Sequence, residues 1–361
     1  MLHTSPRREE ERWRINTVRD WLDLLVVPLA LVVISFLFTT QQDQRQQRTE
    51  TQRAEAEREL AEQRAQDEAL QAYLDQMSTL MLDRKLLEAE PGDPVHTLAQ
   101  ARTSTVILRL DSEHNESVTR FLIDSGLAAS SEGSPRLLRE ITLSHATLSD
   151  ANLPNADLRD VDLSGANVND ANLKEANLND ANLSDANLSG AKLILADLGA
   201  ANLSKADLSG ANLEKANLRW ANLPNAYLGN AKLIDAKLID AKLIDANLRK
   251  ADLSGANLSF AFLDSDNLPN ADLRGVDLSW ASLFNAYLSD ADLSAADLSD
   301  AHLLEADLSG ANLSGANLND AKGISNEALY QLAASLEGAA MPNGQMYEVW
   351  IKDKESHGED E

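Results

Sequence analysis

A leucine recurs at every fifth position through the second half of the chain. From Leu143 to Leu318 the only replacement at this position is Val168. Two residues before each of them stands Ala in all but four cases, which are Ile141, Val161, Asp266 and Val276. An α-helix cannot keep such residues on one face, because five residues at about 100° each rotate the side chain by about 140° per repeat. The period therefore indicates short extended segments joined by regular corners.

Each five-residue unit, or pentad, contains one extended side and one corner. An Ala and a Leu two residues apart face the same side of an extended segment. The last two positions of the pentads are rich in Ser, Gly, Asp, Asn, Pro and Lys, which favour turns. Four pentads can close a square coil of twenty residues, and successive coils then pair about 4.8 Å apart. We therefore predict a solenoid of about nine coils, roughly 43 Å long, around a dry core of Ala and Leu.

The repeat resembles a known family. The run "ANLSDANLSGAKL" from Ala181 is similar to the pentapeptide-repeat family, and the likeness covers residues 141–322. It implies a mainly β fold, a right-handed quadrilateral β-helix with four pentads per coil. The central family position falls on Leu143 through Leu318, and the small position on Ala146 through Ala316. The segment "DEALQAYLDQMSTLMLDRKLL" also looks like a region that accompanies membrane-anchored bacterial members.

An apolar run near the N-terminus predicts a membrane anchor. The sequence "WLDLLVVPLALVVISFLF", residues 21–38, is apolar apart from Asp23 and Ser35. As a helix it would span about 27 Å, enough to cross a bilayer, although a buried core helix is the alternative. Five arginines precede the run and three follow it in the next polar stretch, namely Arg7, Arg8, Arg12, Arg14 and Arg19, then Arg45, Arg48 and Arg53. This bias predicts a cytoplasmic N-terminus and a C-terminal rod outside.

The remaining segments complete a predicted domain plan. It has a polar and basic segment at 1–20, a transmembrane helix at 21–40, a polar helical stalk at 41–65, a small helical module at 66–128, a linker at 129–140, the β-helix at 141–322, and a C-terminal helix cap with a tail at 323–361. The stalk carries no apolar stripe at heptad spacing, so whether it pairs with a second stalk stays open. The family resemblance separately implies dimerisation through the C-terminal cap, so a homo-oligomer is one expectation among others.

The helical module and the C-terminal helix are predicted to cover the two ends of the rod. In the module, apolar residues recur at helical spacing in three groups: Leu70, Tyr73, Leu74, Met77, Leu80 and Met81; Leu98, Ala101, Thr105 and Leu108 after a helix start at Asp93; and Val118, Phe121 and Leu122. At the other end, Ser325 is a predicted N-cap and Gly338 a predicted helix end, with a turn and a short strand after it. Covered ends would keep strand edges from pairing with other chains.

Composition excludes several classes of function. The net charge of −26 and pI near 4.5 argue against nucleic-acid binding. The chain has no Cys, and its six His are scattered without metal-ligand spacing. Ser and Asp recur because corners need them, and no glycine-rich phosphate loop is present. We therefore predict no catalytic residue, no metal site and no cofactor, and a protein that is not an enzyme.

Outward aromatic residues form the candidate site. With twenty residues per coil, Trp220, Phe260 and Trp280 fall on one edge of the rod, while Phe262 and Phe284 fall on the adjoining side. Aromatic residues make up only 4% of the chain, so their alignment predicts a patch for a protein partner. The alternative is local packing over neighbouring corners.

Asp266 is the second anomaly, because it occupies an inward Ala position. We predict a local bulge that lets its carboxylate reach water or a backbone N–H, since a lone buried carboxylate is costly. A ligand site at this position is the alternative.

These features favour a membrane-anchored, non-enzymatic scaffold that presents a rigid acidic rod to an unidentified protein partner. The alternative comes from the family resemblance, since some pentapeptide-repeat proteins mimic duplex DNA and interact with gyrase. The acidic charge fits that alternative, but a membrane anchor does not. An enzyme within the helical module is a third interpretation, supported only by its generic helices.

Overall fold

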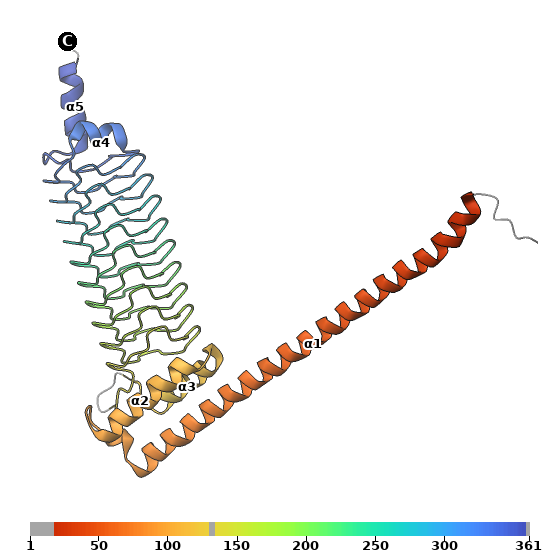
Figure 1. The fold of residues 1–361 in the computed structure, drawn as a ribbon. Coiled ribbons are helices and arrows are strands. Elements are labelled where there is room, and N and C mark those ends of the chain that lie inside the picture. Colours follow the sequence, from red (N-terminus) through yellow and green to blue (C-terminus); the bar gives the residue numbers. More distant parts are fainter. Residues whose placement is uncertain (1–17, 130–133, 359–361) are drawn as a thin grey trace, which may run out of the picture. The chain divides into compact units, whose positions relative to one another are not determined.

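The computed structural model describes residues 18–129 and 134–358, without the side chains of residues 18–24, 27, 357 and 358. The chain divides into two units, one ending at Ala65 and one beginning at Gln66. Its helices are α1 (Val18–Asp83), a 3₁₀ helix η1 (Leu86–Glu88), α2 (Pro94–Arg109), α3 (Ser112–Asp124), α4 (Asn326–Leu332) and α5 (Tyr347–Gly358) (Figure 1). Between α3 and α4 lies a stack of coils.

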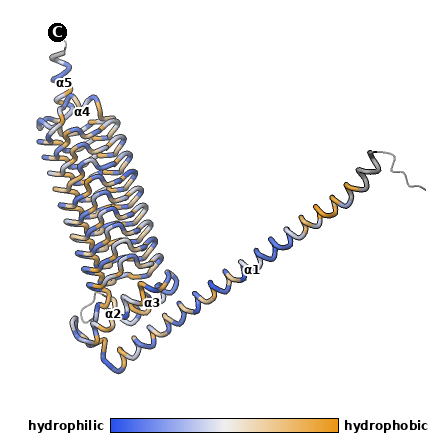
Figure 2. Tube along the Cα trace, viewed as in Figure 1, coloured by the Kyte–Doolittle hydropathy of each residue, from blue (hydrophilic) through white to orange (hydrophobic). Residues whose placement is uncertain are grey.

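The first unit contains most of α1. The predicted stalk at 41–65 is helical, and hydrophobic residues precede it in the same helix (Figure 2). Within the described ranges, no helix is both long and apolar enough to cross a membrane. The predicted span at 21–40 includes residues 21–24 and 27, whose side chains are outside the description. The predicted segment at 1–20 lies outside it up to residue 17.

The coils confirm the twenty-residue period. Every fifth residue from Thr142 to His302 pairs in parallel with the residue twenty positions later, as Asn182 pairs with Asn202. In this pair of coils Leu183 N donates to Asn202 O at 2.7 Å, and Asn202 N donates to Ala181 O at 2.9 Å. Each coil therefore satisfies the backbone groups of its neighbours, and residues twenty apart lie one above another.

The corners explain the polar residues of the repeat. At the corner after Leu183, Ala186 N donates to Leu183 O at 3.2 Å, which closes a β-turn. The third residue of this turn, Asp185, has φ 57°, the left-handed conformation that Gly, Asn and Asp tolerate best. The Asn182 Oδ1 atom accepts a hydrogen bond from Ser184 N at 3.3 Å. In most pentads an Asn or Asp precedes the Leu, and a side chain placed as Asn182 is braces the corner that follows.

The core contains the side chains that the repeat predicts. The Leu and Ala side chains at the two repeat positions are buried along the rod. On the axis of the first coils, a residual space of about 10 Å³ is bounded by Leu143, Leu148, Leu153 and their neighbours. Such a space is at the lower limit for one water molecule, and its lining is almost entirely apolar, so it offers a water too few hydrogen-bond partners. Each buried Leu contributes roughly 1.5–3 kcal/mol of transfer free energy.

Asp266 is buried without a bulge. Its side chain has no exposed surface, and the ladder continues through it, because Tyr287 N donates to Asp266 O at 2.9 Å. The Oδ1 atom accepts from Ala246 N at 2.8 Å, whereas Oδ2 has no hydrogen-bond partner among the described residues. The predicted backbone contact is confirmed and the predicted bulge is wrong, because the Ala position has room for a short side chain beside a backbone N–H.

The helical module covers the first coil, as predicted. Ser104 Oγ of α2 donates to Thr142 O at 2.7 Å, and Asn115 Nδ2 of α3 donates to Thr147 O at 2.8 Å. On another side, Ala128 O accepts from Asp157 N at 2.8 Å. These bonds satisfy coil-edge groups that would otherwise be open to other chains.

One predicted helix face in the module is wrong. Leu98, Ala101, Thr105 and Leu108 are exposed on α2, whereas Ala99, Thr103, Val106 and Ile107 are buried. The prediction fails because α2 carries apolar residues on two sides. The side that packs against α1 is the one with Thr103, whose Oγ1 lies 3.0 Å from Tyr73 Oη in a buried contact. The other two groups are confirmed in their main members, because Tyr73, Met77, Leu80, Val118 and Leu122 are buried.

The C-terminal segment differs from the prediction. Ser325 caps α4 as expected, with its Oγ accepting from Ala328 N at 3.1 Å, but α4 ends at Leu332 and not near Gly338. Residues 334–343, "ASLEGAAMPN", add two further pentads, in which Asn312 pairs with Ser335 and Asn317 with Ala340. These partners lie 23 residues apart because the segment that contains α4 replaces the one side above Asp307 and is three residues longer than a pentad. After the predicted turn the extended segment is a single antiparallel bridge, Met346 to Ala340, and α5 follows directly from Tyr347.

Candidate partner-binding surface

One side of the rod carries all five predicted aromatic residues on its surface. We call this side the aromatic face, defined as Trp220, Phe260, Phe262, Trp280 and Phe284 with Ile244 and Leu304. The exposed fraction of the five aromatic side chains runs from 63% at Trp220 to 42% at Phe284. Phe262 pairs with Lys242 below it and Ser282 above it, which fixes its place on this side.

Two of the rings contact each other. Phe260 and Trp280 stack with centroids 6.2 Å apart and planes 9° apart. The Lys322 Nζ atom lies 5.5 Å from the centre of the Trp280 ring. For Phe260 and Trp280 the alternative interpretation is therefore partly correct, because each ring packs over the neighbouring corner. About half of each ring remains exposed all the same.

Three of these aromatic residues occupy strained corners. Trp220, Phe260 and Trp280 have φ values of 59°, 60° and 61°. Most other corners place Gly, Asn or Asp at this position, which accept a left-handed backbone more readily. A bulky residue held there costs on the order of 1 kcal/mol. Because these side chains stay outside the core, their strain is not offset by core burial, which points to a role for the surface that they form.

Ile244 and Leu304 belong to the same face, although the aromatic residues alone do not reveal them. Their exposed fractions are 37% and 53%, and they share a column with Phe284. The signal was available in the sequence, because positions 244, 284 and 304 leave the same remainder when divided by twenty. The face thus extends over four successive coils above Trp220.

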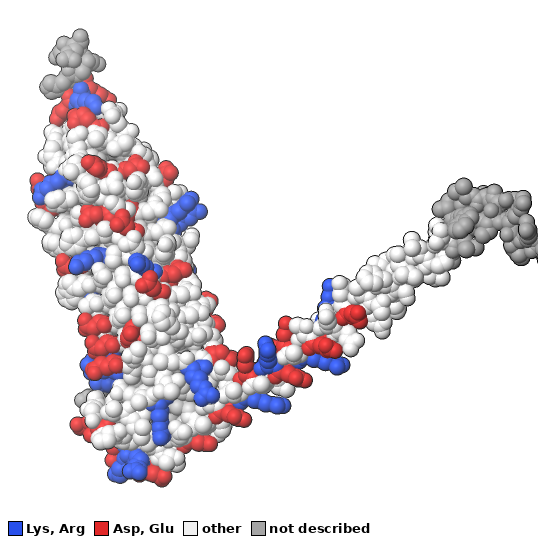
Figure 3. Space-filling model, viewed as in Figure 1, with Lys and Arg blue, Asp and Glu red and all other residues white. Residues whose placement is uncertain are grey.

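Carboxylates border the aromatic face. Asp240 and Asp300 lie at one corner of this side, and Asp245 and Glu305 lie at the other. Asp264 lies within it, where it accepts hydrogen bonds from the Ser282 hydroxyl and, at 3.2 Å, from Phe284 N. In the described part of the chain none of these five is in an ion pair. Acidic side chains also recur along the visible surface of the rod (Figure 3).

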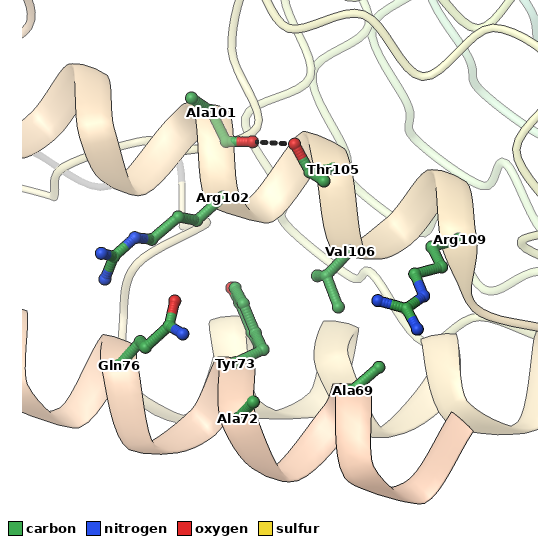
Figure 4. A pocket seen from close by; sticks show the side chains of 9 residues that line it. All are labelled: Ala69, Ala72, Tyr73, Gln76, Ala101, Arg102, Thr105, Val106 and Arg109. Atoms are coloured by element: carbon green, nitrogen blue, oxygen red, sulfur yellow. Dashed lines mark hydrogen bonds between the residues drawn. The ribbon is translucent and has the colours of Figure 1, made fainter. Parts of the chain in front are cut away.

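The helical module has a groove between α1 and α2 (Figure 4). It holds about 360 Å³ and is lined on α2 mainly by Arg102, Thr105, Val106 and Arg109. Tyr73 and Gln76 of α1 face them across small Ala side chains. Burial raises the pKa of Tyr73 and keeps its hydroxyl neutral. The lining contains no carboxylate and no histidine, so it offers no group for proton transfer near neutral pH.

Within the described ranges, no three His, Cys, Asp or Glu side chains gather to hold a metal ion. The nearest arrangement is His114, whose Nδ1 lies 2.7 Å from Asp111 Oδ1 and whose Nε2 lies 3.3 Å from Asp67 Oδ1. Burial lowers the pKa of His114, but the hydrogen bonds to these two carboxylates outweigh it and raise the pKa. This cluster joins α1 to α3 within the module.

The repeat region also matches a family model described as pentapeptide repeats. The matched segments are 141–180, 181–219, 211–249, 231–265, 251–290 and 286–322, which together cover half of the chain. The chain belongs to the pentapeptide-repeat family. Proteins of this family are generally non-enzymatic scaffolds.

Solved structures place the pentapeptide-repeat region among known β-helices. HetL, a pentapeptide-repeat protein involved in heterocyst differentiation regulation in the cyanobacterium Nostoc sp. strain PCC 7120, is 37% identical over 58% of this chain and 88% of its own, with a TM-score of 0.50. The Nostoc protein alr5209 is 40% identical over 28% and 82%, with a TM-score of 0.25. The plasmid-mediated fluoroquinolone resistance protein QnrB1 is 19% identical over 54% and 95%, with a TM-score of 0.35. The comparison with curated proteins found no match.

Proposed function

We propose that this pentapeptide-repeat protein is a non-enzymatic scaffold that binds a protein partner through its aromatic face. The observation that carries the proposal is the placement of Trp220, Phe260 and Trp280 at left-handed corners, exposed and in one column. Aromatic residues, Trp above all, dominate the binding energy of protein interfaces. A surface that keeps them outward against backbone strain fits that role.

The rod makes such a surface effective because it is preorganised. Each exposed residue of the face belongs to a pentad whose Leu and Ala are buried and whose backbone pairs with the coils above and below. The positions of the rings are therefore fixed before any partner arrives. Binding to a fixed surface loses less conformational entropy than binding to a mobile loop.

The proposal predicts that the triple variant Trp220→Asn, Phe260→Asn and Trp280→Asn captures at least tenfold less partner than the wild type after crosslinking in intact cells. Asn is chosen because it tolerates the left-handed backbone of these corners. We expect stability to stay near the wild-type value, because relief of strain, on the order of 1 kcal/mol per site, offsets the lost ring stacking. Quantitative mass spectrometry of the captured proteins and a thermal melt measure the two effects.

Leu195→Asn is the matched control. Leu195 is also bulky, half exposed and left-handed at φ 58°, but it lies on a different corner of the rod. This variant should relieve the same strain and leave partner capture unchanged. Equal capture by the triple variant and the wild type would contradict the proposed role of the aromatic face.

We further propose that residues 21–40 anchor the protein in a membrane, with the N-terminus cytoplasmic and the rod outside. The support is the apolar run at 21–38 and the excess of Arg before it. The full chain should stay in the membrane pellet after alkaline carbonate extraction, and a variant without residues 1–40 should not. An epitope tag after Glu361 should be removed by protease added to intact cells. Release by carbonate contradicts the anchor, and a protected tag contradicts the orientation.

The alternative function, a DNA mimic that interacts with gyrase, rests on the acidic charge of the rod. A mimic of a phosphate backbone needs ordered negative charge over its length, whereas exposed rings at strained corners do not serve that purpose. The aromatic face therefore favours the scaffold.

A further inference from the structure

We infer that the partner segment seated on the aromatic face is an amphipathic helix with an apolar stripe flanked by Lys and Arg. The inference rests on the proposed function and deepens it, because it states the chemistry of the occupant. Three features of the face carry it: the spacing of its side chains, the charges at its borders, and the ring that already receives an ammonium group.

The spacing of the face suits a helix lying along the rod. Its large side chains recur once per coil, about 4.8 Å apart. A helix rises about 5.4 Å per turn, so each turn can place one apolar side chain between those of successive coils. In an extended strand, residues on the same side are about 6.6–6.8 Å apart. This spacing does not match the spacing of the coils, so the side chains of the strand lose register with the face after two coils. Over the four coils from Ile244 to Leu304, three turns of helix are needed.

The charge at the borders of the face specifies a basic partner. In the four coil sides at 240–245, 260–265, 280–285 and 300–305, five residues are acidic and Lys242 is the single Lys or Arg. The acidic residues at the two corners, Asp240 and Asp300 opposite Asp245 and Glu305, border the apolar residues on both sides. A helix with Lys or Arg on both sides of its apolar stripe would pair with both borders, and an acidic helix would be repelled.

The Trp280 ring shows that the face accepts cations. Lys322 Nζ lies 5.5 Å from the centre of this ring. The ring stacks on Phe260, and about half of each of the two side chains is exposed. A Lys or Arg of the partner can occupy the same kind of position on Trp220 or Phe260. Such contacts add to the apolar burial and do not require a loss of the Lys322 contact.

The same features disfavour two other occupants. A second copy of this chain, docked face to face, would bring the acidic borders of both copies together, with Lys242 and Lys322 too few to balance the five acidic residues on each face. The chain's own polar helix at 41–65 lacks an apolar stripe to lay on the rings. The second copy remains an outcome that the test reports.

The test uses a synthetic 18-residue helical peptide with Leu along one stripe and Lys on both sides of it, labelled for fluorescence anisotropy. The full-length chain is held in zwitterionic lipid nanodiscs, and empty nanodiscs serve as the blank. Two control peptides are used, one with every Lys replaced by Glu and one with the same composition scrambled so that no stripe remains. We expect the Lys peptide to bind at least tenfold more tightly than either control.

Two protein variants locate the site. Trp220→Asn, Phe260→Asn and Trp280→Asn together should weaken binding of the Lys peptide at least tenfold, whereas Leu195→Asn should leave it unchanged. Asp240→Asn, Asp245→Asn and Asp300→Asn together, which keep side-chain shape and tolerate the corner backbone, should weaken it about tenfold at low salt. Equal binding of the scrambled or Glu peptide overturns the inference, and so does binding of the Lys peptide by either triple variant at the wild-type affinity.

The outcomes separate this inference from the proposed function. If the crosslinked partner is lost in the aromatic variant but the Lys peptide fails to bind, the face is a docking surface for another chemistry and only the inference falls. If neither effect is seen, both fall. A wild-type dimer, detected by analytical ultracentrifugation and abolished by the aromatic substitutions, assigns the face to a second copy and also overturns the inference.

Discussion

Leu243→Asp is expected to unfold the middle of the rod and to cost at least about 4 kcal/mol of stability, because a carboxylate would enter a dry core. Leu243 has no exposed surface and belongs to the column of inward Leu residues. Asp266 stands at the small Ala position of its pentad, where its carboxylate accepts a hydrogen bond from Ala246 N. In Leu243→Asp, by contrast, the new carboxylate would lie among Leu side chains on the axis of the rod. Thermal unfolding followed by circular dichroism measures the loss.

The adjacent residue supplies the control for this experiment. Ile244 follows Leu243 directly, is exposed, and occupies the corner position that Asp264 holds one coil later. Ile244→Asp introduces the same charge one residue away and should change stability by less than about 0.5 kcal/mol. Hydrogen exchange should show that Leu243→Asp opens the coils on either side first, since each coil contacts only its neighbours. A melting temperature for Leu243→Asp within two degrees of the Ile244→Asp value would contradict the buried column.

The repeat predicts the β-helix because each pentad repeats one physical solution. Once Ala and Leu are assigned inward, the period fixes the number of residues per coil and the stacking of residues twenty apart. What the repeat does not predict is an interruption. The last two pentads, at 334–343, cannot be predicted from the period alone because the segment with α4 shifts their register by three residues, although Leu336 and Gly338 still carry the pattern.

The helical module shows the limit of side-chain periodicity. In the part of α1 that belongs to the module, residues 66–83, the predicted face holds, because Tyr73 and Met77 are buried. On α2 two faces compete, and the packed one contains Thr103, whose hydroxyl partner Tyr73 comes from another helix. Such a contact between distant residues cannot be seen in either sequence segment alone.

The candidate site was predictable in position but not in its energetic character. Trp220, Phe260 and Trp280 differ in number by multiples of twenty, so the coil length alone places them in one column. The positive φ at these corners, the stacking of two rings and the approach of Lys322 depend on backbone and rotamer geometry. It is this geometry that turns an alignment of aromatic residues into an argument for function.

Asp266→Ala is expected to stabilise the protein at pH 7 by about 1–3 kcal/mol, the usual cost of a buried polar group that lacks a partner. Burial raises the pKa of Asp266 well above its usual range, and the nearby Asp245 and Asp264 carboxylates raise it further, although the hydrogen bond from Ala246 N opposes the shift. Ala is the residue that nearly every other pentad holds at this position. The substitution does not orphan Ala246 N, which also donates to Leu243 O at 2.7 Å.

The sign of the pH dependence follows from that raised pKa. The folded state binds the Asp266 proton more tightly than the unfolded state, so wild-type stability falls as pH rises from the unfolded pKa, about 3.9, through the folded one. The advantage of Asp266→Ala should therefore shrink as pH falls toward 4, and urea unfolding at several pH values measures it. Asp245→Asn, on the exposed corner nearby, should shift stability by less than about 0.5 kcal/mol while lowering the pH at which the wild-type loss is complete, because removal of the Asp245 charge lowers the pKa of Asp266 in the folded state. An Asp266→Ala variant less stable than the wild type at pH 7 would mean that this carboxylate is retained for its contribution to folding, and the burial cost assigned to it here would be wrong.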